Sequence, residues 1–366
     1  MNPRGLLRRM MPAMAVLAAL AAAGCGDNGG GGGGNGGGKI ALLLPESKTA
    51  RYETHDRPIF EQRVKELCPD CEILYSNANQ DPAKQQQQAE AALTAGADVL
   101  VLDAVDAASA GPIVQRAKAQ NVPVISYDRL VTDADIDYYI SFDNVRVGEL
   151  QARSLSKKLA SQGRANGPIV MINGAPTDNN AKLFRQGAKS VFDKNGVRIA
   201  KEYDTPDWSP DKAQNEMQQA ITALGNDGFA GVYAANDGTA GGAIAAMKSA
   251  GIDPSTRPTT GQDAELAAIQ RILNGEQDMT VYKAIKPEAQ VAARIAVNLI
   301  NGEKPSSRLV KDTVDNGKKE VPSVLLTPVA VTKDNIEDTV VKDGFWKPSQ
   351  ICTQAFAAAC KTAGIS

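Results

Sequence analysis

Polar side chains able to bind hydroxyl groups follow several predicted strands. They are Asp128 and Arg129 after one apolar run, Asn236 after a second, and Asp263 and Lys283 after two more. Carboxylate and amide oxygens accept hydroxyl protons, whereas arginine, lysine and amide nitrogens donate to hydroxyl lone pairs. Because charged partners strengthen such bonds, this set suits a neutral, hydroxyl-rich ligand such as a sugar.

Each of these residues alone has an ordinary explanation. An Asp or Asn after a strand often caps a helix or lies in a surface turn. The repeated placement favours a site, because ligands of doubly wound sheets bind beyond the carboxyl ends of the strands.

Tryptophan occurs only twice. Trp208 lies in the turn-rich segment 204–210, a poor place for a core residue, and is predicted to stack on the C–H face of a sugar. An anchor on a lobe surface is the alternative. Trp346, near the C-terminal cysteines, is predicted to be structural.

The composition argues against catalysis and against nucleic acid. The net charge is -2, and His55 is the only histidine. Asp128 and Asp263 could serve a hydrolase, but no G-x-S-x-G element, metal-ligand cluster or calcium loop accompanies them. We therefore expect a binding protein without metal or cofactor.

Short apolar runs alternating with helical patterns must position these residues. Strands are predicted at 40–44, 72–75, 98–102, 122–126 and 138–141, with helices at 58–67, 82–95 and 108–120. The pattern restarts with strands at 168–172, 197–203, 229–235 and 279–282 and helices at 145–160, 180–194, 210–224, 239–250 and 264–273. Continuous apolar strands separated by helices predict an α/β protein with two doubly wound parallel-sheet lobes. The ligand cleft is expected between them.

The N-terminus predicts export. Three arginines precede an apolar stretch, 10–23, that is shorter than the roughly 20 residues of a membrane span and is typical of a signal peptide. Residues 20–25 resemble a bacterial lipobox with Cys25 as the lipidated residue. Ordinary signal cleavage is the alternative. The nearly pure glycine segment that follows is typical of a flexible tether.

We therefore predict a lipoprotein signal peptide at 1–24 and a lipidated cysteine with its tether at 25–38. The protein would be anchored to the outer face of the cell membrane, on the periplasmic side in a Gram-negative cell.

The other four cysteines predict two disulfides, Cys68 with Cys71 and Cys352 with Cys360. An even count in an oxidising compartment favours this pairing. A redox CxxC or half of a zinc site is the alternative for the first pair.

Several longer motifs carry a resemblance to a known family. They are 127–129 with 133–144, 178–185, 236–244, 261–263, 280–283 and 321–328. They closely resemble bacterial sugar-binding proteins of the type I periplasmic-binding-protein family, and among them the D-xylose-binding subfamily. The resemblance runs from about residue 39 to 345.

The resemblance implies two Rossmann-like lobes, joined by three crossovers, that close on a monosaccharide by a hinge. The lobes would be 39–142 plus about 284–326, and 143–283 plus about 327–345, followed by a tail, 346–366. The closed form would dock on an ABC permease, and we expect a monomer. A regulator of the lactose-repressor type shares this fold but begins with a helix-turn-helix, which this sequence lacks.

The resemblance also implies ligand-binding residues. They are Arg51, Tyr52, Asp128, Arg129, Asn180, Trp208, Asn236, Asp263 and Lys283, with Lys48 as a further candidate. Tyr52 stands where the family has Trp, and the loop 45–49 is about one residue longer than the corresponding loop of the D-xylose-binding subfamily. Because of both departures, a multiple-sugar receptor for glucose, galactose or arabinose remains the alternative to a D-xylose-binding protein. Such a receptor could serve import, chemotaxis or a sensor.

Overall fold

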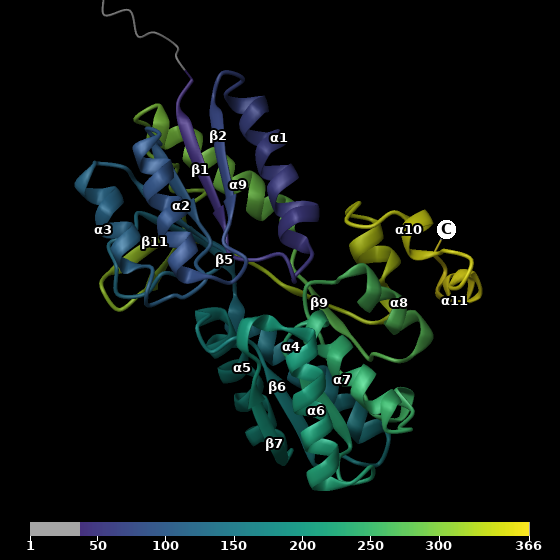
Figure 1. Ribbon diagram of the computed structural model, residues 1–366. Helices are drawn as coiled ribbons and strands as arrows, with labels where there is room; N and C mark the ends of the chain where they lie inside the picture. Colours follow the sequence, from purple (N-terminus) through teal and green to yellow (C-terminus); the bar gives the residue numbers. More distant parts are fainter. Residues whose placement is uncertain (1–36, 366) are drawn as a thin grey trace, which may run out of the picture. The chain divides into compact units, whose positions relative to one another are not determined.

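The computed structural model describes residues 37–365 (Figure 1). The predicted signal peptide, Cys25 and nearly all of the predicted tether lie outside the described residues. Between residues 37 and 365, no helix combines the length and the apolar character that crossing a bilayer requires.

A seven-stranded sheet forms what we call the first lobe. Its strand order is β10-β11-β5-β4-β3-β1-β2, and every neighbouring pair is parallel except β10 with β11. The strands are β1 (Lys39–Leu44), β2 (Glu72–Asn77), β3 (Val99–Leu102), β4 (Val124–Tyr127), β5 (Tyr138–Phe142), β10 (Asp312–Asp315) and β11 (Glu320–Leu326).

Helices cover both faces of this sheet because successive strand residues point to opposite sides. Ile40 and Leu42 pack with α1 (Arg57–Leu67) and α9 (Ile285–Ile300). Ala41 and Leu43 pack with α2 (Pro82–Thr94) and α3 (Gly111–Ala119). The layers match those predicted for a doubly wound sheet.

The second lobe repeats this arrangement. Its strands are β6 (Ile169–Asn173), β7 (Ile199–Asp204), β8 (Gly231–Ala234), β9 (Thr280–Tyr282) and β12 (Val329–Val331). Strands β7-β6-β8 are parallel, and β9 pairs antiparallel with β12. Backbone bonds of the segment 258–263 to Val232 and Val281 join the two groups of strands. Four helices cover the faces: α4 (Asn144–Ser161), α5 (Asn179–Asn195), α6 (Pro210–Leu224) and α7 (Asp237–Ser249).

The chain passes between the lobes three times, from β5 to α4, from β9 to α9 and from β11 to β12. The predicted fold class is confirmed. Helix α9 and strands β10, β11 and β12 were not predicted from the sequence. The sheets were predicted to be parallel, whereas β10 and β12 pair antiparallel with their neighbours.

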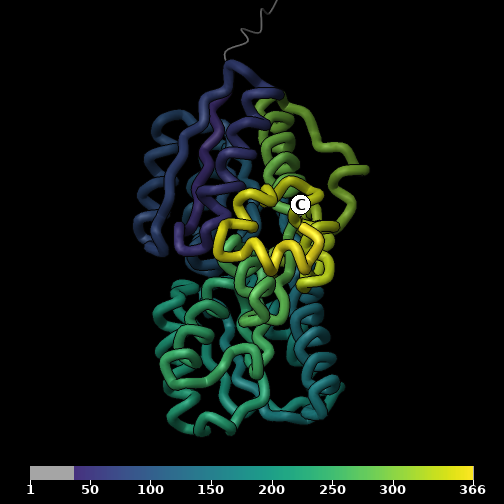
Figure 2. Tube along the Cα trace, turned by 90° about the vertical axis from the view of Figure 1, so that its right-hand side faces the viewer, coloured from purple at the N-terminus to yellow at the C-terminus, as the bar shows by residue number. Residues whose placement is uncertain are grey.

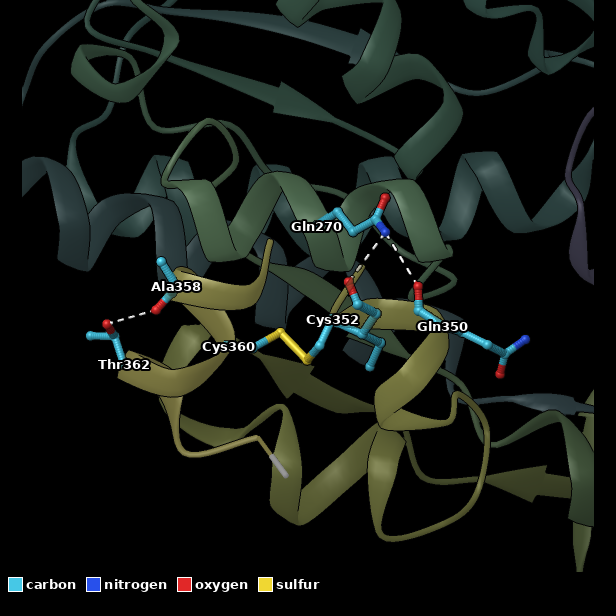
Figure 3. Close-up of a disulfide and its surroundings, with 7 residues drawn as sticks. Gln270, Gln350, Cys352, Ala358, Cys360 and Thr362 are labelled. Atoms are coloured by element: carbon cyan, nitrogen blue, oxygen red, sulfur yellow. Dashed lines mark hydrogen bonds between the residues drawn. A yellow bond between two sulfur atoms is a disulfide. The ribbon is translucent and has the colours of Figure 1, made fainter. Parts of the chain in front are cut away.

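Both predicted disulfides are confirmed. Cys68–Cys71 joins the end of α1 to the start of β2. Cys352–Cys360 joins the tail helices α10 (Pro348–Ile351) and α11 (Ala357–Ala363). The tail, yellow in Figure 2, lies beside α8 (Leu266–Asn274). Figure 3 shows Gln270 of α8 donating to the carbonyl group of Gln350 next to this disulfide. Gln270 also donates to the carbonyl group of Ile351.

His55 links the first lobe to the residues that precede the tail helices. Its ring stacks on Phe345 with centroids 4.1 Å apart, and its Nε2 donates to the Phe345 carbonyl at 3.1 Å. Trp346 lies edge-on, 4.8 Å away. Burial lowers the pKa of His55 from its ordinary value of 6.5, so the neutral ring is the form that folding favours.

This gives a prediction for pH. The pKa of His55 is lower in the folded protein than in the unfolded chain. The contribution of the neutral ring to the free energy of unfolding is therefore complete above about pH 6.5, and it is lost as the pH falls through the folded-state pKa. Calorimetry should show a larger Tm difference between wild type and His55→Gln at neutral pH than at about pH 5. An equal difference at both pH values would contradict the role of this ring.

Candidate ligand-binding site

Polar and aromatic side chains of both lobes line a small, enclosed cavity. None of the lining residues is more than 5% exposed, so a ligand held there would be shielded from water. They are Thr49, Tyr52, Asp128, Arg129, Asp178, Asn180, Phe184, Trp208, Asn236, Gln262, Asp263 and Lys283.

Eight of the ten predicted binding residues lie in this lining; Arg51 and Lys48 do not. Arg51 is buried directly behind it, with Nη1 3.5 Å from Asp128 Oδ2 and 3.8 Å from Asp263 Oδ1. Lys48 is exposed and does not reach the cavity. The Glu46 carboxylate accepts the backbone N–H groups of Lys48 and Thr49, and this turn buries Thr49 rather than Lys48.

Four lining residues were not predicted from the sequence: Thr49, Asp178, Phe184 and Gln262. The last three fall inside motifs that carry the family resemblance, so the signal was present without a role for each position. Asp178 caps α5 by accepting from the Asn180 N–H at 2.8 Å. It also accepts from Trp208 Nε1 at 3.1 Å and lies 3.0 Å from Arg129 Nε. Its carboxylate thus fixes the orientation of two predicted ligand-binding side chains.

Asp128 is the central carboxylate of the site. Its oxygens accept from Tyr52 Oη at 2.9 Å and from Lys283 Nζ and Asn180 Nδ2 at 3.4 Å each. Burial raises the pKa of Asp128, but Arg51, Lys283 and Arg129 outweigh burial and hold the pKa well below its usual value. The group is therefore an ionised acceptor.

Lys283 lies between two of the three carboxylates that line the cavity. Its Nζ lies 3.4 Å from both Asp128 Oδ1 and Asp263 Oδ1. Burial lowers the pKa of Lys283, but the two carboxylates raise it further, so the net shift is upward and the amine stays charged. Gln262 Nε2 donates to the other oxygen of Asp263 at 2.9 Å.

Some buried polar atoms here have hydrogen-bonding capacity left. Within residues 37–365, Arg51 Nη1, Asp263 Oδ1 and Gln262 Oε1 make no hydrogen bond. Leaving such a group unsatisfied costs about 1–3 kcal/mol, more when it is charged. One donor and two acceptors close together can be satisfied by hydroxyl groups, which both donate and accept.

Trp208 belongs to the core of the second lobe as well as to the cavity wall. Its ring is buried and lies 6.4 Å from that of Phe184, edge to face. The expectation that segment 204–210 is a poor place for a core residue was wrong. The reason is close packing on Gly174, where a Cβ atom would lie 1.9 Å from Trp208 Cη2.

Three residues that line the cavity have strained backbone conformations. The φ angles of Asp128, Trp208 and Asp263 are 53°, 52° and 93°. Residues other than glycine rarely adopt positive φ, and such conformations persist where the surrounding structure imposes them, often at functional sites. Within the part of the chain that the structure describes, no group of three His, Cys, Asp or Glu side chains could hold a metal ion.

Comparison with known proteins decides the family. Residues 40–304 match the periplasmic binding protein domain. The chain belongs to this family. Among other members, it is 41% identical over 317 residues to a D-xylose-binding periplasmic protein of Escherichia coli K12, covering 86% of this chain and 92% of that protein. It is 32% identical over 330 residues to the multiple sugar-binding periplasmic receptor ChvE of Rhizobium radiobacter, with the same coverage.

Solved structures of periplasmic-binding-protein relatives agree with the fold. An ABC transporter solute-binding protein from Clostridium phytofermentans, with bound β-D-glucose, superposes with a TM-score of 0.76 at 27% identity. The match covers 86% of this chain and 99% of that one. A carbohydrate transporter solute-binding protein from Chloroflexus aurantiacus, in complex with D-glucose, gives 0.75 at 28% identity, covering 85% and 97%.

Proposed function

We propose that this protein is an extracytoplasmic solute-binding protein that captures a monosaccharide, with D-xylose as its preferred sugar, and delivers it to an ABC importer. The observation that carries the proposal is the buried cavity, in which both lobes present hydroxyl-binding groups around Asp128. The D-xylose-binding relatives at 41% and 39% identity support the choice of sugar.

In this proposal the binding residues divide by chemistry. The carboxylates of Asp128 and Asp263 accept from ligand hydroxyls, and the rings of Tyr52 and Trp208 contact the apolar C–H patch. The donors are Arg51, Arg129, Asn180, Asn236 and Lys283. A ligand bound by both lobes at once would favour their closed arrangement by its differential affinity for that state.

Binding without catalysis is the better interpretation of the carboxylates. A hydrolase of this type needs one carboxylic acid, with a raised pKa, to protonate the leaving group. In the pair that could serve a hydrolase, Asp128 has a lowered pKa, and the ammonium of Lys283 lies 3.4 Å from both it and Asp263. Burial raises the pKa of the third carboxyl of the cavity, Asp178, but its oxygens already accept from Trp208 Nε1 and the Asn180 N–H. The family consists of sugar-binding transport proteins, and we propose that this member is not an enzyme.

The attachment to the cell is also a proposal. The relatives named above are periplasmic proteins. We propose that Cys25 is acylated and that the glycine-rich segment 26–38 tethers a monomeric binding domain to the membrane. Mass spectrometry of the N-terminal peptide from native membranes should show diacylglycerol on Cys25. An unmodified mature N-terminus would indicate ordinary signal cleavage.

Calorimetric titration with xylose, glucose, galactose, arabinose and ribose tests the function. We expect tight one-to-one binding of xylose and much weaker binding of the others. Comparable binding of several sugars would identify a multiple-sugar receptor, which the ChvE-type relatives and Tyr52 make the second candidate. Binding of none of the five would contradict the ligand assignment.

A further inference from the structure

A second pocket adjoins the cavity. It has a volume of about 310 Å³ and is open to solvent. Its walls come from the turn η1 (Tyr52–Asp56) in the first lobe, from α8, and from Phe345 and Trp346. Asp263 lines both the pocket and the cavity. The two spaces therefore share one carboxylate as a wall.

One part of the pocket wall is apolar and aromatic. Leu266 of α8 and the rings of Phe345 and Trp346 line it. The Trp346 Nε1 donates to the Ala264 carbonyl at 2.8 Å, which fixes the orientation of the ring. A fixed aromatic surface of this kind suits the apolar face of a ring-shaped ligand.

One polar group in the pocket has no partner. Glu265 lines it, and the Oε1 of this carboxyl is buried and makes no hydrogen bond with any residue from 37 to 365. Burial, with the nearby charge of Asp237, raises the pKa of Glu265 to about 8. The carboxyl is thus neutral at neutral pH and can exchange hydrogen bonds with an uncharged hydroxyl. A purely apolar ligand would leave it unsatisfied, at a cost.

We propose that this pocket is a second sugar subsite, which takes a hydroxylated ring with its apolar face toward Trp346 and a hydroxyl on Glu265. The proposal rests on the proposed sugar binding in the cavity. The ring can belong to a disaccharide whose other ring occupies the cavity, or it can be a separate monosaccharide. Both present the same chemistry to the pocket, and experiment separates them.

Three proteins test the subsite by calorimetric titration with xylose and with the β-1,4-linked disaccharide of xylose. They are wild type, Ala267→Phe and Ala223→Phe. Ala267 is an exposed residue of α8 that lines the pocket, so a phenyl ring there fills it. Ala223 is an exposed alanine of α6 outside both spaces, and it controls for an added surface ring.

A disaccharide subsite predicts that wild type binds the disaccharide and that Ala267→Phe weakens this binding at least tenfold, while Ala223→Phe does not. A separate monosaccharide predicts a second, weaker xylose event that only Ala267→Phe abolishes. One-to-one xylose binding in all three proteins, with the disaccharide bound equally by all or by none, would overturn the subsite and leave the proposed function intact. Failure of wild type to bind xylose would instead contradict the proposed function.

Glu265→Leu provides an independent check with a side chain of similar volume. Leucine neither donates nor accepts a hydrogen bond, so binding in the subsite should weaken about tenfold, whereas Glu265→Gln, whose amide does both, should bind much as wild type does. The fluorescence of Trp346, measured as the difference between wild type and Trp346→Phe, should change with the subsite event. No change in either measurement would argue against contact of the ligand with these residues.

Discussion

Replacing Asp128 with asparagine is expected to weaken sugar binding by about 2–5 kcal/mol, or roughly 30- to 5,000-fold in Kd. The substitution keeps the volume but removes the charge that lies 3.4 Å from Lys283 Nζ and 3.5 Å from Arg51 Nη1. Two buried cations then lose a partner, and the ligand loses its ionised acceptor. Calorimetric titration with xylose measures the effect.

Asp135→Asn is the matched control. Asp135 pairs with Lys319 on the surface and is 56% exposed on its side chain. Exposed pairs contribute about 0–1 kcal/mol, so this variant should bind sugar as wild type does. If Asp128→Asn also bound within threefold of wild type, Asp128 would not be the central acceptor.

Replacing Trp208 with alanine is expected to lower the free energy of unfolding by about 3–5 kcal/mol, because it leaves a large hole in the core of the second lobe. Sugar binding should fall as well, since the cavity loses its aromatic wall. Urea denaturation and titration measure the two effects separately.

Gly174→Ala tests the same contact from the other side. Its methyl group would lie 1.9 Å from Trp208 Cη2, so the ring must move, and both stability and sugar affinity should drop. Gly111→Ala serves as the control, because a Cβ there meets nothing within 4 Å. If the two alanine variants had equal stability and equal sugar affinity, the position of the Trp208 ring would not matter for either property.

The sequence predicts the central strands of both lobes well because they are buried on both faces and read as continuous apolar runs. The strands toward the edge of the first sheet carry a weaker signal. In β11, which lies between β10 and β5, exposed Glu320 and Pro322 alternate with buried Val321 and Ser323, and its strand character depends on pairing with β5. In α9, Pro287 lies in the first turn, where proline is tolerated, so the helical pattern was present in the sequence and was missed.

Two helices begin later in the sequence than predicted, each for a local reason. The helix predicted from residue 108 begins at Gly111, because the Asp106 carboxylate accepts from the N–H groups of Ala108 and Ser109 and holds a turn. The helix predicted from 264 begins at Leu266, after two residues with positive φ, Asp263 and Ala264.

The candidate site was predicted from the residues that follow strands and from the family motifs, because contacts between side chains cannot be seen in a sequence. Both identify Asp128 and Asp263, but neither reveals that Asp178 orients Trp208 and Arg129, since those partners come from different loops. The position of Lys48 outside the cavity wall depends on the direction of a single turn at Glu46. Such details follow from three-dimensional packing and leave no trace in residue spacing.

The place of β11 in the first sheet has a consequence for biogenesis. Ser323 pairs with Tyr139, so the sheet begun by β1 is completed only when the chain has been synthesised almost to its end. Pairings between distant segments form slowly, because loop closure must precede the contacts that stabilise it. Truncation before residue 320 should therefore yield a protein whose first sheet lacks β11 and its pairing with β5.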